Sequence, residues 1–108
     1  MTMFTGSEGE EITLAEGAEW TANYRAANPT AIKAHFFGST ILNDILSQED
    51  CVGLRMYYAI DGDGGKELVI VGVDANGNDQ TTGIVADRSR PCPDYCDSGN
   101  SPLLNNSK

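Results

Sequence analysis

Two long apolar stretches of this chain are separated by a short segment that can continue neither of them. The segment is Asp61-Gly62-Asp63-Gly64-Gly65, and its glycines allow the positive φ angles that a tight reversal needs. Residues 52–60 alternate in character and place these side chains on one side: Val52, Leu54, Met56, Tyr58 and Ile60. Residues 68–73 are almost continuously apolar and β-branched, which is typical of a strand that is covered on both faces or central in its sheet. The two stretches therefore predict a β-hairpin.

A second turn signal follows the hairpin. Asn76-Gly77 is typical of a two-residue hairpin turn, and apolar residues 84–86 come after it. We therefore expect a three-stranded antiparallel meander over 52–87. Both turns are acidic, but the loop that begins at Asp74 does not complete a calcium-binding EF-hand, because Val85 stands where the last carboxylate is needed.

The residues before the meander carry helix signals. Thr13-Leu14-Ala15-Glu16 matches a capping box, so a helix should begin there. Trp20 and Tyr24 are four residues apart and share a face with Ala27, and we expect this face to lie in the core.

Two further helical segments are expected before residue 50. Asn28-Pro29 can end the first helix and begin a second, short one that reaches about Phe37. Gly38 suits the end of that helix, and residues 40–48 then form a third segment with apolar residues at helical spacing. The second and third segments could instead be one bent helix.

The length of the chain, 108 residues, fits one domain. The predicted fold class is α+β, with two or three N-terminal helices packed on the small antiparallel sheet. The parts are a loose arm at 1–10, a helical part at 13–48, the β meander at 52–87 and a cysteine-bearing tail at 88–108.

The charge of the chain is strongly unbalanced. Sixteen acidic residues against seven basic ones give a formal net charge of −9, which repels phosphate backbones and anionic membranes. No apolar run approaches the ~20 residues of a transmembrane helix, and the N-terminal residues do not resemble a signal peptide. We expect a soluble cytoplasmic protein that binds neither nucleic acid nor membranes.

Three cysteines and one histidine are the chain's soft metal ligands. Cys92 and Cys96 could clip a metal from the tail while Cys51 and His35 complete a closed tetrahedral site for zinc or iron. Two other interpretations remain open. Cys92 and Cys96 could form a local disulfide, or all three thiols could be inert, with Cys51 a small buried hydrophobe.

A small-ligand site is a further candidate. Tyr24, Arg25 and His35 could converge to bind a small anion or carboxylate, since arginine offers a forked donor and tyrosine a hydroxyl. His35 is also flanked by Phe36 and Phe37, and a histidine beside aromatic residues is more often a packing residue.

Four stretches carry a resemblance to known sequences: Ala34-His35-Phe36-Phe37-Gly38, residues 51–58 after Gln48, residues 71–74 and Pro91-Cys92-Pro93. Together they resemble a group of small uncharacterised bacterial proteins, over most of the chain from Tyr24 to Cys96. The resemblance implies no activity and no site.

No nucleophile–base pair and no nucleotide-binding loop can be identified, so no catalytic residue is predicted. The sequence favours a non-enzymatic binding or assembly module, because a small sheet with an exposed edge can recruit a protein partner strand or self-associate as a homo-oligomer. The alternative is a small metal-binding protein that uses His35 and the cysteines.

Overall fold

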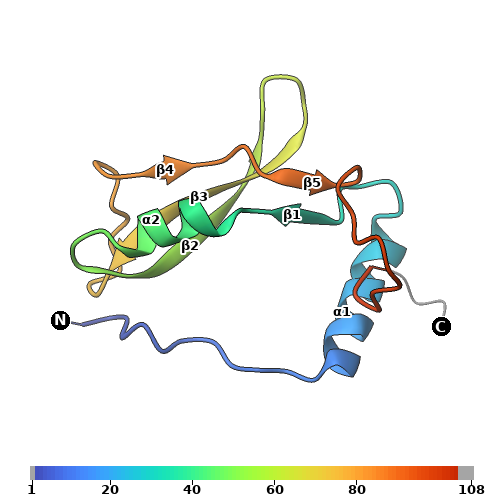
Figure 1. Ribbon diagram of the computed structural model, residues 1–108, viewed down its shortest axis with the longest axis horizontal. Helices are drawn as coiled ribbons and strands as arrows, with labels where there is room; N and C mark the ends of the chain where they lie inside the picture. The colour runs from blue at the N-terminus through green and yellow to red at the C-terminus, as the bar shows by residue number, and fades with distance from the viewer. Residues whose placement is uncertain (1, 105–108) are drawn as a thin grey trace. The chain divides into compact units, whose positions relative to one another are not determined.

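The computed structural model describes residues 2–104, which form two compact units (Figure 1). The sheet unit contains residues 2–9 and 37–89, and the tail unit contains residues 10–36 and 90–104. None of the helices in 2–104 combines the length and apolar composition that crossing a bilayer requires. The prediction of a single domain stays a prediction.

The sheet unit contains the predicted three-stranded antiparallel meander. Its strands are β2 (Cys51–Ile60), β3 (Lys66–Asp74) and β4 (Val85–Ala86), in the order β2-β3-β4. Met56 of β2 pairs with Ile70 of β3, which pairs in turn with Ala86 of β4. The expected α+β fold class and the meander are thus confirmed.

The two turns form because one carboxylate in each collects backbone N–H groups. Asp61 Oδ1 accepts from the N–H groups of Asp63 and Gly65 at 2.9 and 2.8 Å. Asp74 Oδ1 accepts likewise from residues 76 and 78, both at 3.0 Å. Gly77 has a φ of +87°, a conformation that a residue with a Cβ rarely adopts. These bonds fix the reversals that position the site.

Helix α2 (Ser39–Leu46) contacts β2 and β3 and supplies the centre of the core. Ile45 of the helix and Ile70 of β3 are fully buried. Val71 and Val73 point to the opposite side of β3 and are 3% exposed. β3 is therefore covered on both faces, as its continuous apolar sequence predicts, and the helix predicted over 40–48 is confirmed within two residues at either end.

In the tail unit, helix α1 (Leu14–Ala27) begins at the predicted capping box. Thr13 Oγ1 accepts from the Glu16 N–H at 3.0 Å, and Glu16 Oε1 accepts from the Thr13 N–H at 3.2 Å. The prediction that Trp20 and Tyr24 lie in the core is wrong, because they are 56% and 47% exposed. On their face of the helix the neighbours at helical spacing are Gly17 and Ala27, so α1 lacks the continuous apolar stripe that burial needs.

The second predicted helix is also wrong. Residues Ala34–Phe36 form strand β1, which pairs antiparallel with β5 (Arg90–Cys92). The Lys33 N–H also donates to the Cys92 carbonyl at 2.7 Å. The local sequence Asn28-Pro29 favours a helix, but residues 34–36 pair with the tail instead. β1 and the tail strand β5 form a two-stranded sheet of their own.

Candidate functional site: a polar network beside an open sheet edge

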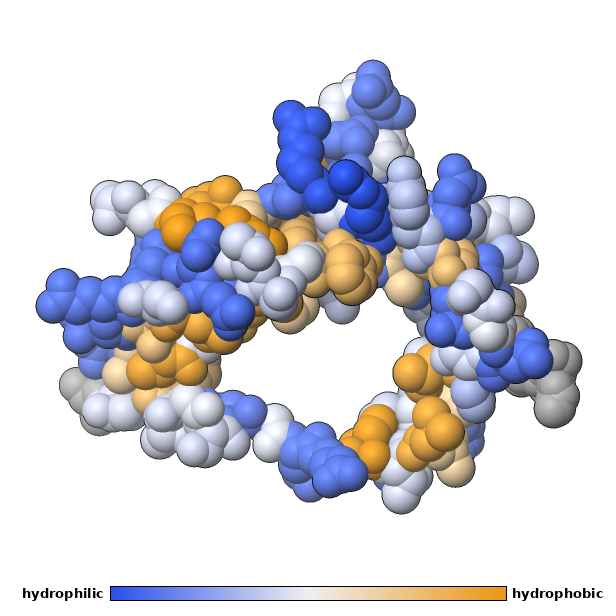
Figure 2. Space-filling model, in the orientation of Figure 1, coloured by the Kyte–Doolittle hydropathy of each residue, from blue (hydrophilic) through white to orange (hydrophobic). Residues whose placement is uncertain are grey.

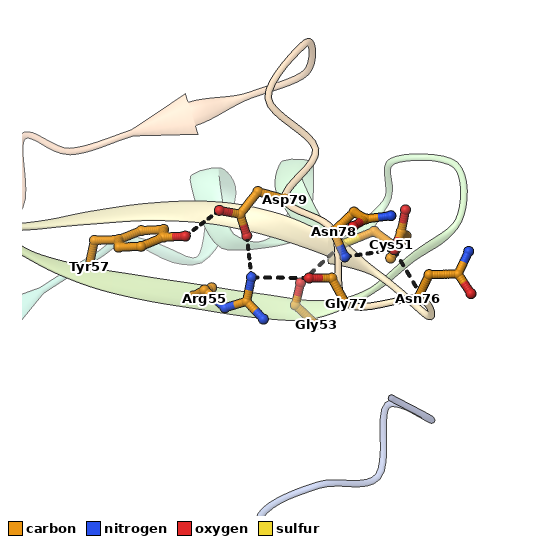
Figure 3. A network of polar contacts seen from close by, with 9 residues as sticks. Cys51, Gly53, Arg55, Tyr57, Asn76, Gly77, Asn78 and Asp79 are labelled. Atoms are coloured by element: carbon orange, nitrogen blue, oxygen red, sulfur yellow. Dashed lines mark hydrogen bonds and ion pairs between the residues drawn. The ribbon is translucent and has the colours of Figure 1, made fainter. Parts of the chain in front are cut away.

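Arg55 and Tyr57 of β2 meet Asp79 of the β3–β4 loop in a polar network (Figure 3). Arg55 Nη1 donates to Asp79 Oδ1 at 2.6 Å and to the Gly77 carbonyl at 3.2 Å. The Tyr57 hydroxyl donates to Asp79 Oδ2. A β-bridge between Val73 and Asp79 holds the carboxylate above this part of β2. The network therefore fastens the loop to the strand.

The network keeps its groups in one protonation state near neutral pH. The hydrogen bond from Tyr57, with the contact to Arg55, lowers the pKa of Asp79 below its ordinary value of 3.8. The same carboxylate raises the pKa of Tyr57 and that of Arg55. A general base at neutral pH needs a pKa near 7. The arrangement suits a structural clamp better than proton transfer.

The N-terminal arm lies against this network. The N–H groups of Met3 and Phe4 donate to the Ala75 carbonyl at 2.7 and 2.9 Å. The Phe4 ring lies 5.7 Å from Arg55 Cζ, within the range of a cation–π contact. A cavity of about 260 Å³ lies beside it, lined by Phe4, Gly6, Glu8, Val52, Gly53, Leu54, Arg55 and Val73. The arm expected to be loose is thus bonded, through Met3 and Phe4, to the turn that follows β3.

A second polar network is centred on Gln48, a residue to which sequence reasoning gave no role. Gln48 Nε2 donates to the Ile45 carbonyl at 3.0 Å, and its Oε1 accepts from the Ile84 N–H at 2.8 Å. A longer bond of 3.3 Å joins Nε2 to Gln80 Oε1. The amides of Gln48 and Gln80 occupy the space that a Cβ on Gly72 would need. The glycine within the β-branched stretch was the available signal, because it indicates a close approach.

Among residues 2–104, no strand pairs with the outer edge of β2, although the N-terminal arm approaches its start at Val52. β2 has ten residues and one neighbour in its sheet, β3. Met56, Tyr58 and Ile60 lie on one face of the strand and are 56%, 95% and 66% exposed. We call these three residues the Tyr58 strip. Figure 2 likewise shows apolar residues at the surface of the face in view. The open main chain and the strip together offer a strand-pairing surface.

Three carboxylates gather at the end of the hairpin, and we call them the turn carboxylates: Asp61, Glu67 and Asp87. A hydrogen bond with Asp61 raises the pKa of Glu67, and partial desolvation and the charge of Asp87 raise it further. Backbone N–H groups, first that of Gly65, lower the pKa of Asp61. Asp87 Oδ1 is buried without a hydrogen-bond partner. Among residues 2–104, the ion pair found is Arg55–Asp79, and none of the turn carboxylates takes part in one.

The four predicted metal ligands are divided between the two units, and their joining in one metal site stays a prediction. Cys92 and Cys96 are joined in a disulfide with Cα atoms 4.7 Å apart, and a bonded sulfur is not the thiolate that binds metals. Cys51 belongs to the sheet unit, where its thiol donates to the Gly53 carbonyl at 3.2 Å. His35 belongs to β1 in the tail unit. In the described part of the chain, no three His, Cys, Asp or Glu residues are grouped to hold a metal ion.

The candidate anion-binding residues all lie in the tail unit, but Arg25 has another contact. Its Nη1 donates to the Leu103 carbonyl at 2.7 Å, which ties the tail to α1. Tyr24 is half-exposed on the same helix and His35 is half-buried on β1. Convergence of Tyr24, Arg25 and His35 on a ligand stays a prediction.

Comparison of the chain with models of known protein families, with curated proteins and with solved structures finds no match. The function must therefore be argued from the chemistry of this chain. Its two informative surfaces are the Arg55 network, which is internally satisfied, and the open edge of β2, which is not.

Proposed function

We propose that the protein is a non-enzymatic binding module that takes an extended segment of a partner protein along the edge of β2. The observation that carries this proposal is the unpaired outer edge of β2 with its exposed Tyr58 strip. In strand addition, main-chain hydrogen bonds supply affinity and alternate side chains supply specificity. Tyr58 is 95% exposed and large, so covering it would remove more apolar area from water than covering any aliphatic neighbour.

The polar network next to the edge supports a binding role. The clamp of Arg55, Tyr57 and Asp79 holds the β3–β4 loop against β2 on the side of the strand opposite the Tyr58 strip. A rigid strand loses little conformational freedom when a second strand pairs with it. The network therefore prepares β2 for a partner without taking part in chemistry.

Charge favours a different protein over a second copy of this one. The chain carries a formal net charge of −9, so association of two copies brings like charges together. We also propose a cytoplasmic location for the protein. The metal-binding alternative would first require reduction of Cys92–Cys96, since thiolates are the ligands.

The experiment is selection of binders from a library of ten-residue peptides displayed on phage, followed by amide hydrogen exchange of the complexes. We expect selected peptides to protect amides of β2 and to lose affinity for Tyr58→Ala. The matched control is Tyr24→Ala, which removes a half-exposed tyrosine from α1 and should leave binding unchanged. Peptides that bind Tyr58→Ala as tightly as the parent protein, or that leave β2 unprotected, would refute the proposal.

A further inference from the structure

We propose that the segment bound by β2 is basic and amphipathic, with apolar residues on one face and lysine or arginine on the other. This inference rests on the proposed function and names the chemistry of the partner. It is argued from the different character of the two faces of β2 and from the charge at the end of the hairpin.

One face of the edge is apolar. The side chains of the Tyr58 strip lie on the same face, because successive residues of a strand point to opposite sides. Met56 pairs with the buried Ile70, and Tyr58 pairs with Leu68, so the strip continues the apolar face of β3 outward to the edge. A strand added to β2 would place every second side chain beside this strip. Those side chains should be apolar.

The other face is acidic near the turn. Ala59 lies on this face and pairs with Glu67, which contacts Asp61 and lies within electrostatic range of Asp87. The small side chain of Ala59 leaves Glu67 accessible from the edge. An added strand would lie about 10 Å from β3, two strand spacings away, and a long basic side chain can span most of that distance toward the carboxylate. The residues of the partner on this face should therefore be lysine or arginine.

Among residues 2–104, none of the turn carboxylates forms an ion pair, and the buried Oδ1 of Asp87 has no hydrogen-bond partner. A cation brought by the partner would relieve the repulsion between them. Charge complementarity thus selects a basic segment from the many that could pair with an open edge.

A second copy of the chain fits less well. Antiparallel pairing of two β2 strands over their full length would bring Asp61 of one copy beside Asp50 of the other. Arg55 could not offset this repulsion, because Asp79 already neutralises it. The same surface that favours a basic partner therefore opposes self-association.

The test uses three synthetic peptides that alternate valine with lysine, with glutamine or with glutamate, each labelled for fluorescence anisotropy at low and high salt. We expect the lysine peptide to bind roughly tenfold more tightly than the glutamine peptide, with the difference shrinking at high salt. The glutamate peptide should not bind. Glu67→Gln should weaken lysine-peptide binding about two- to fivefold, the range for an exposed ion pair. Glu49→Gln, which removes the same charge at the other end of β2, should change it less than Glu67→Gln does.

The outcomes separate this inference from the proposed function. If the glutamine and lysine peptides bind equally well and both lose affinity for Tyr58→Ala, the edge binds strands but the basic partner is wrong. If no peptide binds, or if Tyr58→Ala binds all of them like the parent protein, the strand-binding function itself fails. A concentration-dependent dimer that Tyr58→Lys abolishes would overturn the inference in favour of a second copy. Far-UV circular dichroism of each variant establishes that it is folded.

Discussion

Truncation of Gln48 is expected to destabilise the sheet unit far more than its position at the end of α2 would suggest. In Gln48→Ala, the Ile45 carbonyl and the Ile84 N–H each lose a well-formed hydrogen bond, of 3.0 and 2.8 Å. Each such bond contributes about 1 kcal/mol, and a partly buried group left without a partner costs more. The 3.3 Å bond to Gln80 adds little. We expect a loss of about 2–3 kcal/mol in the free energy of unfolding.

The assay is urea unfolding followed by far-UV circular dichroism, because the single tryptophan, Trp20, lies in the tail unit and reports on the wrong part of the chain. The midpoint should fall by roughly 1–2 M, given the usual dependence of stability on urea. Gln80→Ala removes the 2.9 Å bond to the Glu49 carbonyl and the weak 3.3 Å bond from Gln48, and should cost about 1 kcal/mol. Thr81→Ala changes an exposed side chain and serves as the control. The reasoning fails if Gln48→Ala stays within about 0.5 kcal/mol of the parent protein or if Gln80→Ala costs as much.

Three further predictions concern the clamp, the tail and the first helix. The neighbouring tyrosine lowers the pKa of Asp79 below 3.8, so the carboxylate stabilises the fold above that pH and its contribution is lost as the pH falls through the lowered pKa. The difference in melting temperature between the parent protein and Asp79→Asn should therefore shrink below about pH 4, and a difference that grows would contradict this. Reduction of Cys92–Cys96, which are four residues apart, should cost the tail unit about 2 kcal/mol by loop-closure entropy, measured by urea unfolding with Trp20 fluorescence, and no shift of the midpoint would count against it. Thr13→Ala should cost about 1 kcal/mol in the same assay while Thr13→Ser costs less, and equal losses would rule out the hydroxyl cap.

The parts of the fold that sequence predicts well are those whose signals are local. The meander is specified by signals that lie close together in the sequence: the two acidic turns, the alternation along β2 and the β-branched run of β3. The Thr13 capping box specifies the start of α1 in the same way. By contrast, β1 and β5 are more than fifty residues apart in the sequence, and three-residue strands carry little pattern of their own. Their pairing depends on tertiary contacts that no local rule contains.

The candidate site was less predictable than the fold. The alternation of side chains along a strand puts Arg55 and Tyr57 on the side of β2 away from the Tyr58 strip, but no sequence pattern joins them to Asp79. That contact depends on the bridge to Val73 and on the shape of the loop that follows β3. The turn carboxylates are brought together by the β2–β3 register and by the return of the chain through β4. Composition alone specifies neither.

The packing around Gly72 has a consequence for how sequences of this fold can diverge. A methyl group at this position would come within 2.6 Å of Gln80 Oε1, 2.8 Å of Gln48 Nε2 and 3.0 Å of Cys51 Sγ. Both amides are held by hydrogen bonds to the main chain, so neither can move aside without breaking its hydrogen bond. Homologous chains should therefore accept alanine at position 72 only where positions 48 and 80 have both become smaller, and these three positions should vary together rather than one at a time.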